Sequence, residues 1–408
     1  MGLGAMTRHY ATKHFFRQMP NELLGRYFQT KDVLKDVDFA ALPKKKPDKL
    51  FAAWLKLPDT QRNAMDAELH EIFALCCEKG VIAILDEAEW QLRESPEALS
   101  ALVEKLSALP GHFERAMVTF LDHPAFWQGA CLFCHADTLG FWRKRNNIPQ
   151  KHARTDPKSR KDLAHQISTY FHHTEGRGQN CVVEAYRRGE RDYFFCYPED
   201  HAQQGIEWVN GECARRPHNP AFEIVYVYAQ KEGSLDLSFR GSSKAVGPLQ
   251  AMFALSILNV EELLPDSRDT RVYDLEPLRK RSFRFSYPVD SGIQRVAVKK
   301  LRLSSRIKQG ERLTLEADTE ENAEAIYDLL DQVKKSPEFR LYNYHVTQVE
   351  LVACVALRVD KPPKTFPIRL TYPNSCSLKY DDIGLKLRDM LQCSGIEPKQ
   401  PESAPSDA

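Results

Sequence analysis

Two cysteines followed by a histidine are the sharpest candidate for chemistry in this sequence. Cys131 and Cys134 are three residues apart, and His135 comes next. On a helix both thiols would share a face and could bind one Zn²⁺ ion, about 2.3 Å from each sulfur. The nearest further ligands are His172 and Cys181, but their spacing matches no standard zinc module. Packing as small apolar residues is the alternative. We therefore expect no cofactor and keep zinc at these four residues as a hypothesis.

Two glycine- or serine-containing turns are candidates for binding an anion. Arg177 lies between Gly176 and Gly178, and such a segment can form a nest of backbone N–H groups. Lys244 follows Ser242 and Ser243 at the start of an expected helix, where free N–H groups can hold a phosphate. The glycines could equally serve only to end a helix, and the serines only to cap one. Arg177 and Lys244 are therefore weak candidates.

Several well-known catalytic and nucleotide-binding motifs are missing. The sequence has no Walker motif, no complete dinucleotide fingerprint, no Gly-x-Ser-x-Gly and no His-Glu-x-x-His. All of the 13 histidines except His345 precede residue 219. Histidine chemistry would therefore belong to the first half of the chain. An enzyme using residues 131–213 is one hypothesis, although the sequence does not identify its catalytic residues. The sequence favours a protein without catalytic activity.

Charge is strongly segregated along the chain, although the total is only +1. Residues 141–161 carry a net charge of +7 and residues 278–308 carry +9, whereas residues 59–104 carry −8. Two basic segments far apart in sequence can converge on one surface and release counterions from a nucleic-acid backbone. Phe283, Phe285 and Tyr287 lie within the second segment and could stack on bases or simply face a core.

The two basic segments supply the candidate phosphate contacts. Alternatively, the two basic segments do not bind nucleic acid. They would then form a basic surface exposed to solvent, or a basic surface that docks on the acidic helical region. The candidate nucleic-acid-binding residues are Arg143, Lys144, Arg145, Lys158, Arg160, Lys161, Arg279, Lys280, Arg281, Lys299, Lys300 and Arg302.

Length and composition indicate a folded protein of several domains. The chain has 408 residues, 42% of them hydrophobic, which excludes a disordered chain. No apolar stretch approaches the roughly 18 residues of a membrane helix, so no membrane partner is expected. Ten scattered cysteines within apolar patterns, without a secretion signal, favour a cytoplasmic location.

Hydrophobic periodicity predicts an α+β fold, with an N-terminal all-helical domain followed by two antiparallel sheet-plus-helix units. The predicted boundaries are 1–145 for the helical domain, 146–265 and 266–396 for the two sheet units, and 397–408 for a disordered tail. No strand is expected before Asn180, and residues 265–270 mark a break in composition. Strands are expected at 181–187, 192–197, 222–228, 234–239, 283–287, 295–303, 312–317, 345–359 and 367–372.

The sequence is compatible with three functions. The leading hypothesis is a non-enzymatic cytoplasmic protein that binds the nucleic-acid backbone or acts in a nucleic-acid-associated assembly. The second is a protein-interaction or scaffold protein, in which the acidic helical domain meets a basic partner or the chain associates with itself. The third is the enzyme with its site in residues 131–213.

Overall fold

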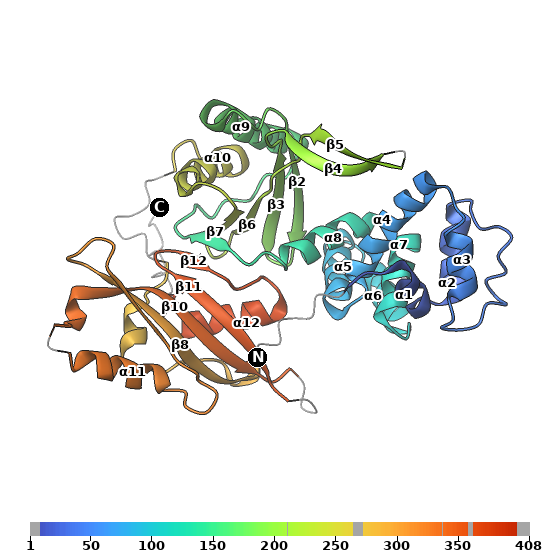
Figure 1. The fold of residues 1–408 in the computed structure, drawn as a ribbon. Coiled ribbons are helices and arrows are strands. Elements are labelled where there is room, and N and C mark those ends of the chain that lie inside the picture. The colour runs from blue at the N-terminus through green and yellow to red at the C-terminus, as the bar shows by residue number, and fades with distance from the viewer. Residues whose placement is uncertain (1–8, 210, 264–271, 337, 358–361, 398–408) are drawn as a thin grey trace. The chain divides into compact units, whose positions relative to one another are not determined.

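The computed structural model describes residues 9–209, 211–263, 272–336, 338–357 and 362–397. The chain forms two compact units (Figure 1). The first unit ends at Thr138 and also contains Arg187–Gly189, and the second unit contains the rest of the chain. The expected composition break at 265–270 and residues 398–408 of the expected tail lie outside the described residues.

Helices make up the N-terminal region, as its apolar spacing predicts. They are α1 (Thr12–Gln18), α2 (Asn21–Thr30), α3 (Asp48–Trp54), α4 (Asp59–Leu75), α5 (Glu78–Gln91), α6 (Pro96–Ser107), α7 (His112–Asp122), the 3₁₀ helix η1 (Pro124–Phe126) and α8 (Trp127–Ala136). In α4, Met65, Leu69, Ile72 and Phe73 recur every three or four residues and are all buried. None of the helices in the described parts of the chain is long and apolar enough to cross a membrane.

An antiparallel sheet of ten strands forms the second unit, which confirms the α+β class. Its strands are β1 (Trp142–Arg145), β2 (Cys181–Arg188), β3 (Arg191–Pro198), β6 (Ile224–Ala229), β7 (Ser234–Phe239), β8 (Ile293–Ser305), β9 (Arg312–Glu316), β10 (Tyr344–Val355), β11 (Lys364–Thr371) and β12 (Ser375–Cys376). Their order is β2-β3-β6-β7-β1-β12-β11-β10-β8-β9. As expected from its apolar run, β6 is a central strand and is buried along its whole length.

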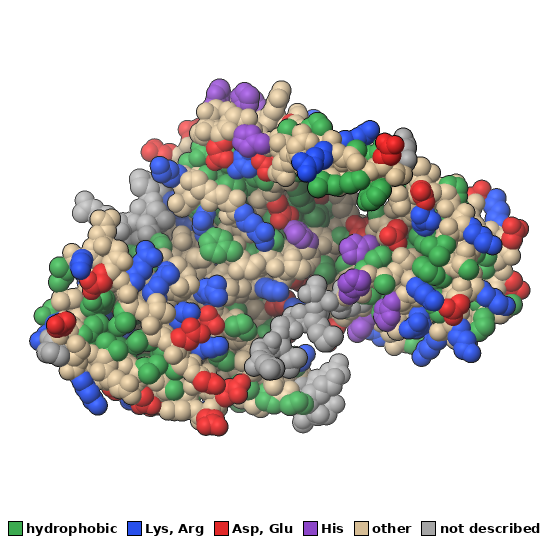
Figure 2. Space-filling model, viewed as in Figure 1, with side chains coloured by type: hydrophobic (Ala, Val, Ile, Leu, Met, Phe, Trp, Pro, Cys, Tyr) green, Lys and Arg blue, Asp and Glu red, His purple; other side chains and the backbone are tan. Residues whose placement is uncertain are grey.

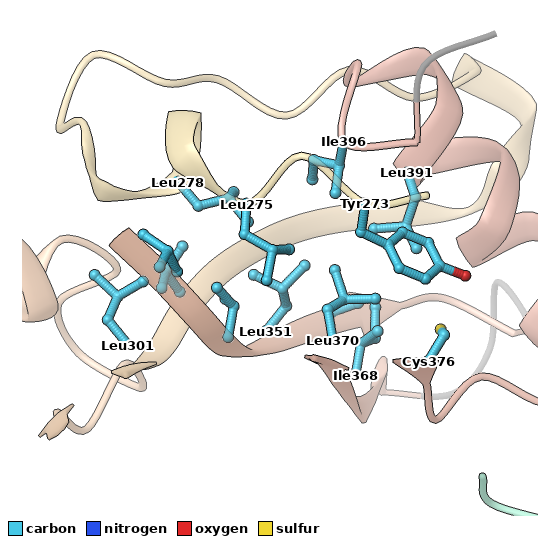
Figure 3. Packing of buried hydrophobic residues seen from close by; sticks show 14 of the residues in the cluster. Tyr273, Leu275, Leu278, Leu301, Leu351, Ile368, Leu370, Cys376, Leu391 and Ile396 are labelled. Carbon is cyan, nitrogen blue, oxygen red and sulfur yellow. The ribbon is translucent and has the colours of Figure 1, made fainter. Parts of the chain in front are cut away.

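The remaining helices of the second unit divide between the two halves of the sheet. They are α9 (Pro157–Glu175), α10 (Val246–Leu258), α11 (Ala325–Lys334), α12 (Asp382–Cys393) and the 3₁₀ helices η2 (Ser243–Ala245), η3 (Glu276–Arg279), η4 (Val289–Ser291) and η5 (Leu341–Asn343). One core packs α9 and α10 against β3, β6 and β7. A second core packs η3, α11 and α12 against β8, β10 and β11. Figure 3 shows Leu275 and Leu391 above Leu351 and Leu370 in this second core.

Strand β1 overturns the expectation that no strand precedes Asn180. Residues 142–145 fall inside the region 1–145 that the sequence assigns to the helical domain, yet they pair with β7 on one side and with β12 on the other. The segment reads Trp-Arg-Lys-Arg, so it carries no apolar alternation that could reveal a strand. Through β1, strands from residues 181–239 and strands from residues 293–376 belong to one sheet.

The strand expected at Phe283–Tyr287 is absent, and this prediction is wrong. No strand of the described residues pairs with the segment. The Ser286 N–H donates to Ser394 Oγ at 2.9 Å, and the Ser394 hydroxyl donates to the Ser286 carbonyl at 3.1 Å. The aromatic side chains at 283, 285 and 287 nevertheless pack against the second core, in line with one of the two alternatives that the sequence left open.

The chain segment that connects β3 to β6 forms a separate hairpin, which was not predicted from the sequence. Its strands are β4 (Gln203–Val209) and β5 (Glu212–His218), and they form a two-stranded sheet of their own. The segment contains Gly205, charged residues and Pro217, so its apolar alternation is weak.

Candidate nucleic-acid interface

Alternation along the strands places a row of polar side chains on one face of the sheet. Directly opposed residues run across six strands, and because opposed residues of antiparallel strands share a face, all six point to the same side. On the opposite face, the neighbouring row is apolar and belongs to the second core: it includes Cys376, Leu370, Val349 and Leu301. The polar row consists of Arg143, Ser375, Thr371, Gln348, Arg302 and Thr314.

The polar row joins the two basic segments of the sequence. Arg143 comes from the first segment and Arg302 from the second, and four strand spacings separate them, about 19 Å. Both side chains are partly exposed. Arg143 Nη1 and Arg302 Nε are buried atoms without a hydrogen-bond partner in the described part of the chain, so any anion would have to contact the other guanidinium nitrogens.

A second row on the same face carries paired charges. Arg369, Glu350, Lys300 and Glu316 are directly opposed on β11, β10, β8 and β9. Lys300 Nζ lies 2.8 Å from Glu316 Oε2, and Arg369 Nη2 lies 3.5 Å from Glu350 Oε2. These pairs neutralise much of the charge of the second row. Figure 2 shows Lys and Arg side chains together with Asp and Glu over the C-terminal half of the sheet.

Aromatic side chains flank the polar row. Phe141 is 43% exposed, and the Arg143 guanidinium lies 5.0 Å from the centre of its ring. Tyr372 is 41% exposed, and its ring lies 6.1 Å from that of His345, which is opposed to Ser304 on β8. Exposed rings beside arginines can stack on unpaired bases.

Helix α10 lies on the same side of the sheet as the polar row. Arg143 and Arg145 are two residues apart on β1 and therefore point to the same face. Arg145 Nη1 donates to Gln250 Oε1 of α10 at 3.4 Å. Arg145 is thus buried beneath this helix, whereas Arg143 lies on the part of the face that carries the polar row.

Lys144 points to the opposite face and enters a buried network of charges. Its ammonium group lies 2.7 Å from Glu397 Oε1 and 3.4 Å from Glu232 Oε2, and Asp236 is directly opposite on β7. Burial alone would lower the pKa of Lys144, but the carboxylates of Glu397, Asp236 and Glu232 outweigh it and raise that pKa. Arg388 of α12 is also buried here, 4.2 Å from the centre of the Tyr380 ring. Lys144 is therefore buried and paired with carboxylates, and it is not available to a ligand at the surface.

The other basic candidates are spread over several elements. On α9, Lys158 and Lys161 are exposed and Arg160 is partly exposed. Arg279 donates to the Leu341 and Tyr344 carbonyls, and Lys280 is exposed next to it. Arg281 forms ion pairs with three carboxylates of α11 and the turn before it, those of Glu324, Asp328 and Asp331. Lys299 is partly exposed on β8, next to Lys300. Of the twelve candidates, Arg143, Arg145, Lys300 and Arg302 point to one face of the sheet, and Arg145 is buried there beneath α10.

The two anion-binding candidates have local structural roles. Arg177 pairs with Glu175 and Asp200, and its guanidinium lies 4.0 Å from the centre of the Phe222 ring. Gly176 ends α9 with φ +70°, as its position in the sequence predicts. Lys244 is exposed, and its N–H donates to the side chain of Ser242, which caps η2. The capping alternative is thus confirmed for Ser242.

The four candidate zinc ligands divide between the two units. Cys131 and Cys134 lie on α8 of the first unit, whereas His172 and Cys181 belong to the second. Burial raises the pKa of Cys134 to about 11 and that of Cys181 to about 12, and it also raises the pKa of Cys131. Within the described ranges, no three His, Cys, Asp or Glu side chains are grouped so that they could hold a metal ion.

The uncharged members of the polar row were missed by the sequence analysis. They are Thr314, Gln348 and Thr371, in strands that were expected, and Ser375, in the short β12. Period-two alternation assigns each to a solvent face, but only the strand order shows that they lie in one row.

No family model matches this chain, and no curated sequence matches it either.

Proposed function

We propose that this protein binds nucleic acid on the face of its sheet that carries Arg143 and Arg302. The observation that carries the proposal is the polar row, which holds arginines from both basic segments on one surface. Arginine presents several donors in a planar fork and is suited to phosphate oxygens. The serine, threonine and glutamine side chains between the two arginines can also donate to phosphates.

The proposed contacts involve the backbone rather than particular bases. Arg143 and Arg302 are about 19 Å apart, so a strand lying across the sheet meets positive charge at two points. Lys300 and Arg369 contribute less, because Glu316 and Glu350 lie beside them. Exposed Phe141 and Tyr372 favour a strand whose bases are accessible for stacking. Binding should therefore depend on salt and only weakly on sequence.

Fluorescence anisotropy tests this proposal with labelled mixed-sequence DNA and RNA of about 20 nucleotides, single-stranded and duplex, in about 50 and 200 mM salt. We expect affinity to fall as salt rises. The double variant Arg143→Gln/Arg302→Gln should bind about tenfold more weakly or worse, because each arginine loses a charged hydrogen bond. The slope of log affinity against log salt should become shallower by about 2, one for each lost phosphate contact.

Arg284→Gln is the matched control. Arg284 lies in the second basic segment and its side chain is 72% exposed, but it belongs to the unpaired segment at 283–287 and is not on the sheet. Its replacement should leave binding nearly unchanged. The proposal is wrong if none of the probes binds at about 10 µM protein in low salt, or if Arg284→Gln weakens binding as much as the double variant does.

A further inference from the structure

The hairpin of β4 and β5 exposes large apolar side chains. Trp208 is 77% exposed and Ile206 is 68% exposed, among the highest values for large apolar residues in the described part of the chain. A two-stranded hairpin is marginally stable in water, and three or more strands are normally needed for stability. In the described residues, β4 and β5 pair only with each other, so both outer edges are unpaired. The hairpin therefore has both an apolar surface and free edges that a partner could cover.

One face of the hairpin is largely apolar. Gln204, Ile206 and Trp208 alternate along β4 and point to the same side. Directly opposite Trp208 on β5 is Cys213, which is exposed, and opposite Ile206 is Arg215. Figure 2 shows hydrophobic side chains at the surface of this hairpin. A tryptophan and an isoleucine side by side on an exposed strand are typical of a protein-interaction surface.

The two edges of the hairpin differ in how well they are protected against pairing. Strand β5 carries Pro217, which has no N–H to donate, and the charged residues Arg215 and Arg216. Strand β4 contains neither proline nor a basic residue, and its one charge is Glu207. Proline and charge are the usual devices that block an edge strand. The free edge of β4 is therefore the one open to another strand.

We infer that a second copy of the chain covers this edge, with two β4 strands paired antiparallel about a two-fold axis at Ile206. In this register Ile206 faces its own mate, Gln204 faces Trp208, and Gly205 faces Glu207. No like charges are opposed, whereas pairing through the middle of β5 would set Arg215 against Arg215. The product is a four-stranded sheet with the apolar side chains of both copies on one face. The interface is self-complementary, as a two-fold dimer requires.

Sedimentation equilibrium of the full-length protein tests the inference, from about 1 to about 100 µM. We expect a concentration-dependent shift from the 46.8 kDa monomer toward twice that mass. Ile206→Lys places two ammonium groups together at the axis and should weaken dimerisation at least tenfold. Ile307→Lys is the control, because Ile307 is 75% exposed outside the hairpin. A monomer at all concentrations overturns the inference, and so does a dimer that Ile206→Lys leaves intact.

Disulfide trapping tests the register without adding charge. The exposed residues Cys213 and Cys393 are first replaced by serine. Directly opposed residues are close enough for a disulfide, so Ile206→Cys should cross-link to itself on oxidation. Gln204→Cys and Trp208→Cys should cross-link to each other when mixed and much less when alone. Equal cross-linking of Ile307→Cys, or none at Ile206→Cys, contradicts the proposed pairing. This inference is independent of the proposed nucleic-acid binding.

Discussion

Buried charge occurs in both units, as Glu87 in the helical unit and as Lys144 in the sheet unit. Glu87 is 1% exposed and Lys144 is 5% exposed. Lys144 lies among the carboxylates of Glu397, Glu232 and Asp236, which offset the cost of its burial. Glu87 Oε1 accepts a hydrogen bond from the Gln91 side chain at 2.5 Å, while Oε2 has no partner in the described residues.

The difference shows that a buried charged group with partners can stabilise the fold, whereas one that lacks partners can destabilise it. Burial raises the pKa of Glu87, and the Gln91 amide only partly opposes this. The carboxylates around Lys144 instead hold the ammonium in its charged form. Removing the charge should therefore destabilise the sheet unit and stabilise the helical unit.

Lys144→Met should have the largest effect on stability. It removes the cation and leaves Glu397 and Asp236 as buried carboxylates, which costs about 3–5 kcal/mol of unfolding free energy. Urea denaturation at pH 7 measures the loss. Lys161→Met, at an exposed position on α9, is the control and should change stability by less than about 0.5 kcal/mol. Equal effects of the two variants would show that the buried network contributes no stability.

Gly129→Ala should come second, because Gly129 makes room for Glu87. A Cβ atom at this position would lie 2.4 Å from the Glu87 carboxyl carbon. We expect a loss of about 1–3 kcal/mol, as for other overpacked sites. In the Glu87→Ala background the clash is absent, so the same glycine substitution should cost much less. Equal costs in both backgrounds, by urea denaturation, would mean that the glycine is not required by the carboxylate.

Glu87→Gln should have the smallest effect, and the opposite sign. At pH 7 the neutral amide removes a buried charge and should stabilise the protein by about 1 kcal/mol. Because the folded pKa of Glu87 is raised, the wild-type protein gains stability as pH falls from that value toward the unfolded pKa, about 4.3. The advantage of glutamine should therefore shrink as the pH approaches 4.

Glu89→Gln is the matched control for the pH experiment, since Glu89 is exposed on the same helix. It should change stability by less than about 0.5 kcal/mol at either pH. Urea denaturation at pH 7 and near pH 4 gives both comparisons. A Glu87→Gln variant that is less stable than wild type at pH 7 would contradict the view that this carboxylate is a strain.

Most of the fold could be predicted from the sequence because most elements carry strong apolar periodicity. The spacing in α4 identified a helix and its buried side, and the apolar run of β6 identified a strand that is buried on both faces. The segment at 283–287 has equally clear alternation but forms no strand, and the N–H and carbonyl of its Ser286 bond to the Ser394 hydroxyl. Alternation reports which side chains are buried, and a strand also needs a neighbour for its hydrogen bonds.

The candidate site was predictable only in part. Net charge pointed to both basic segments, and thus to Arg143 and Arg302. It also pointed to Lys144 and Arg145, which are buried, because neighbouring basic residues look equivalent in a sequence. Once residues 142–145 form a strand, neighbours point to opposite faces. Their different environments then follow from the elements on each side of the sheet.

The sequence by itself determined the α+β class, the helical N-terminal region and the segregation of charge, because these depend on composition and local periodicity. The tertiary structure decided which charges meet. Strand β1 lies between β7 and β12. In this position Lys144 pairs with carboxylates from distant parts of the chain, and Arg143 lies in one row with Arg302. Such pairings are long-range, and local sequence patterns do not encode strand order.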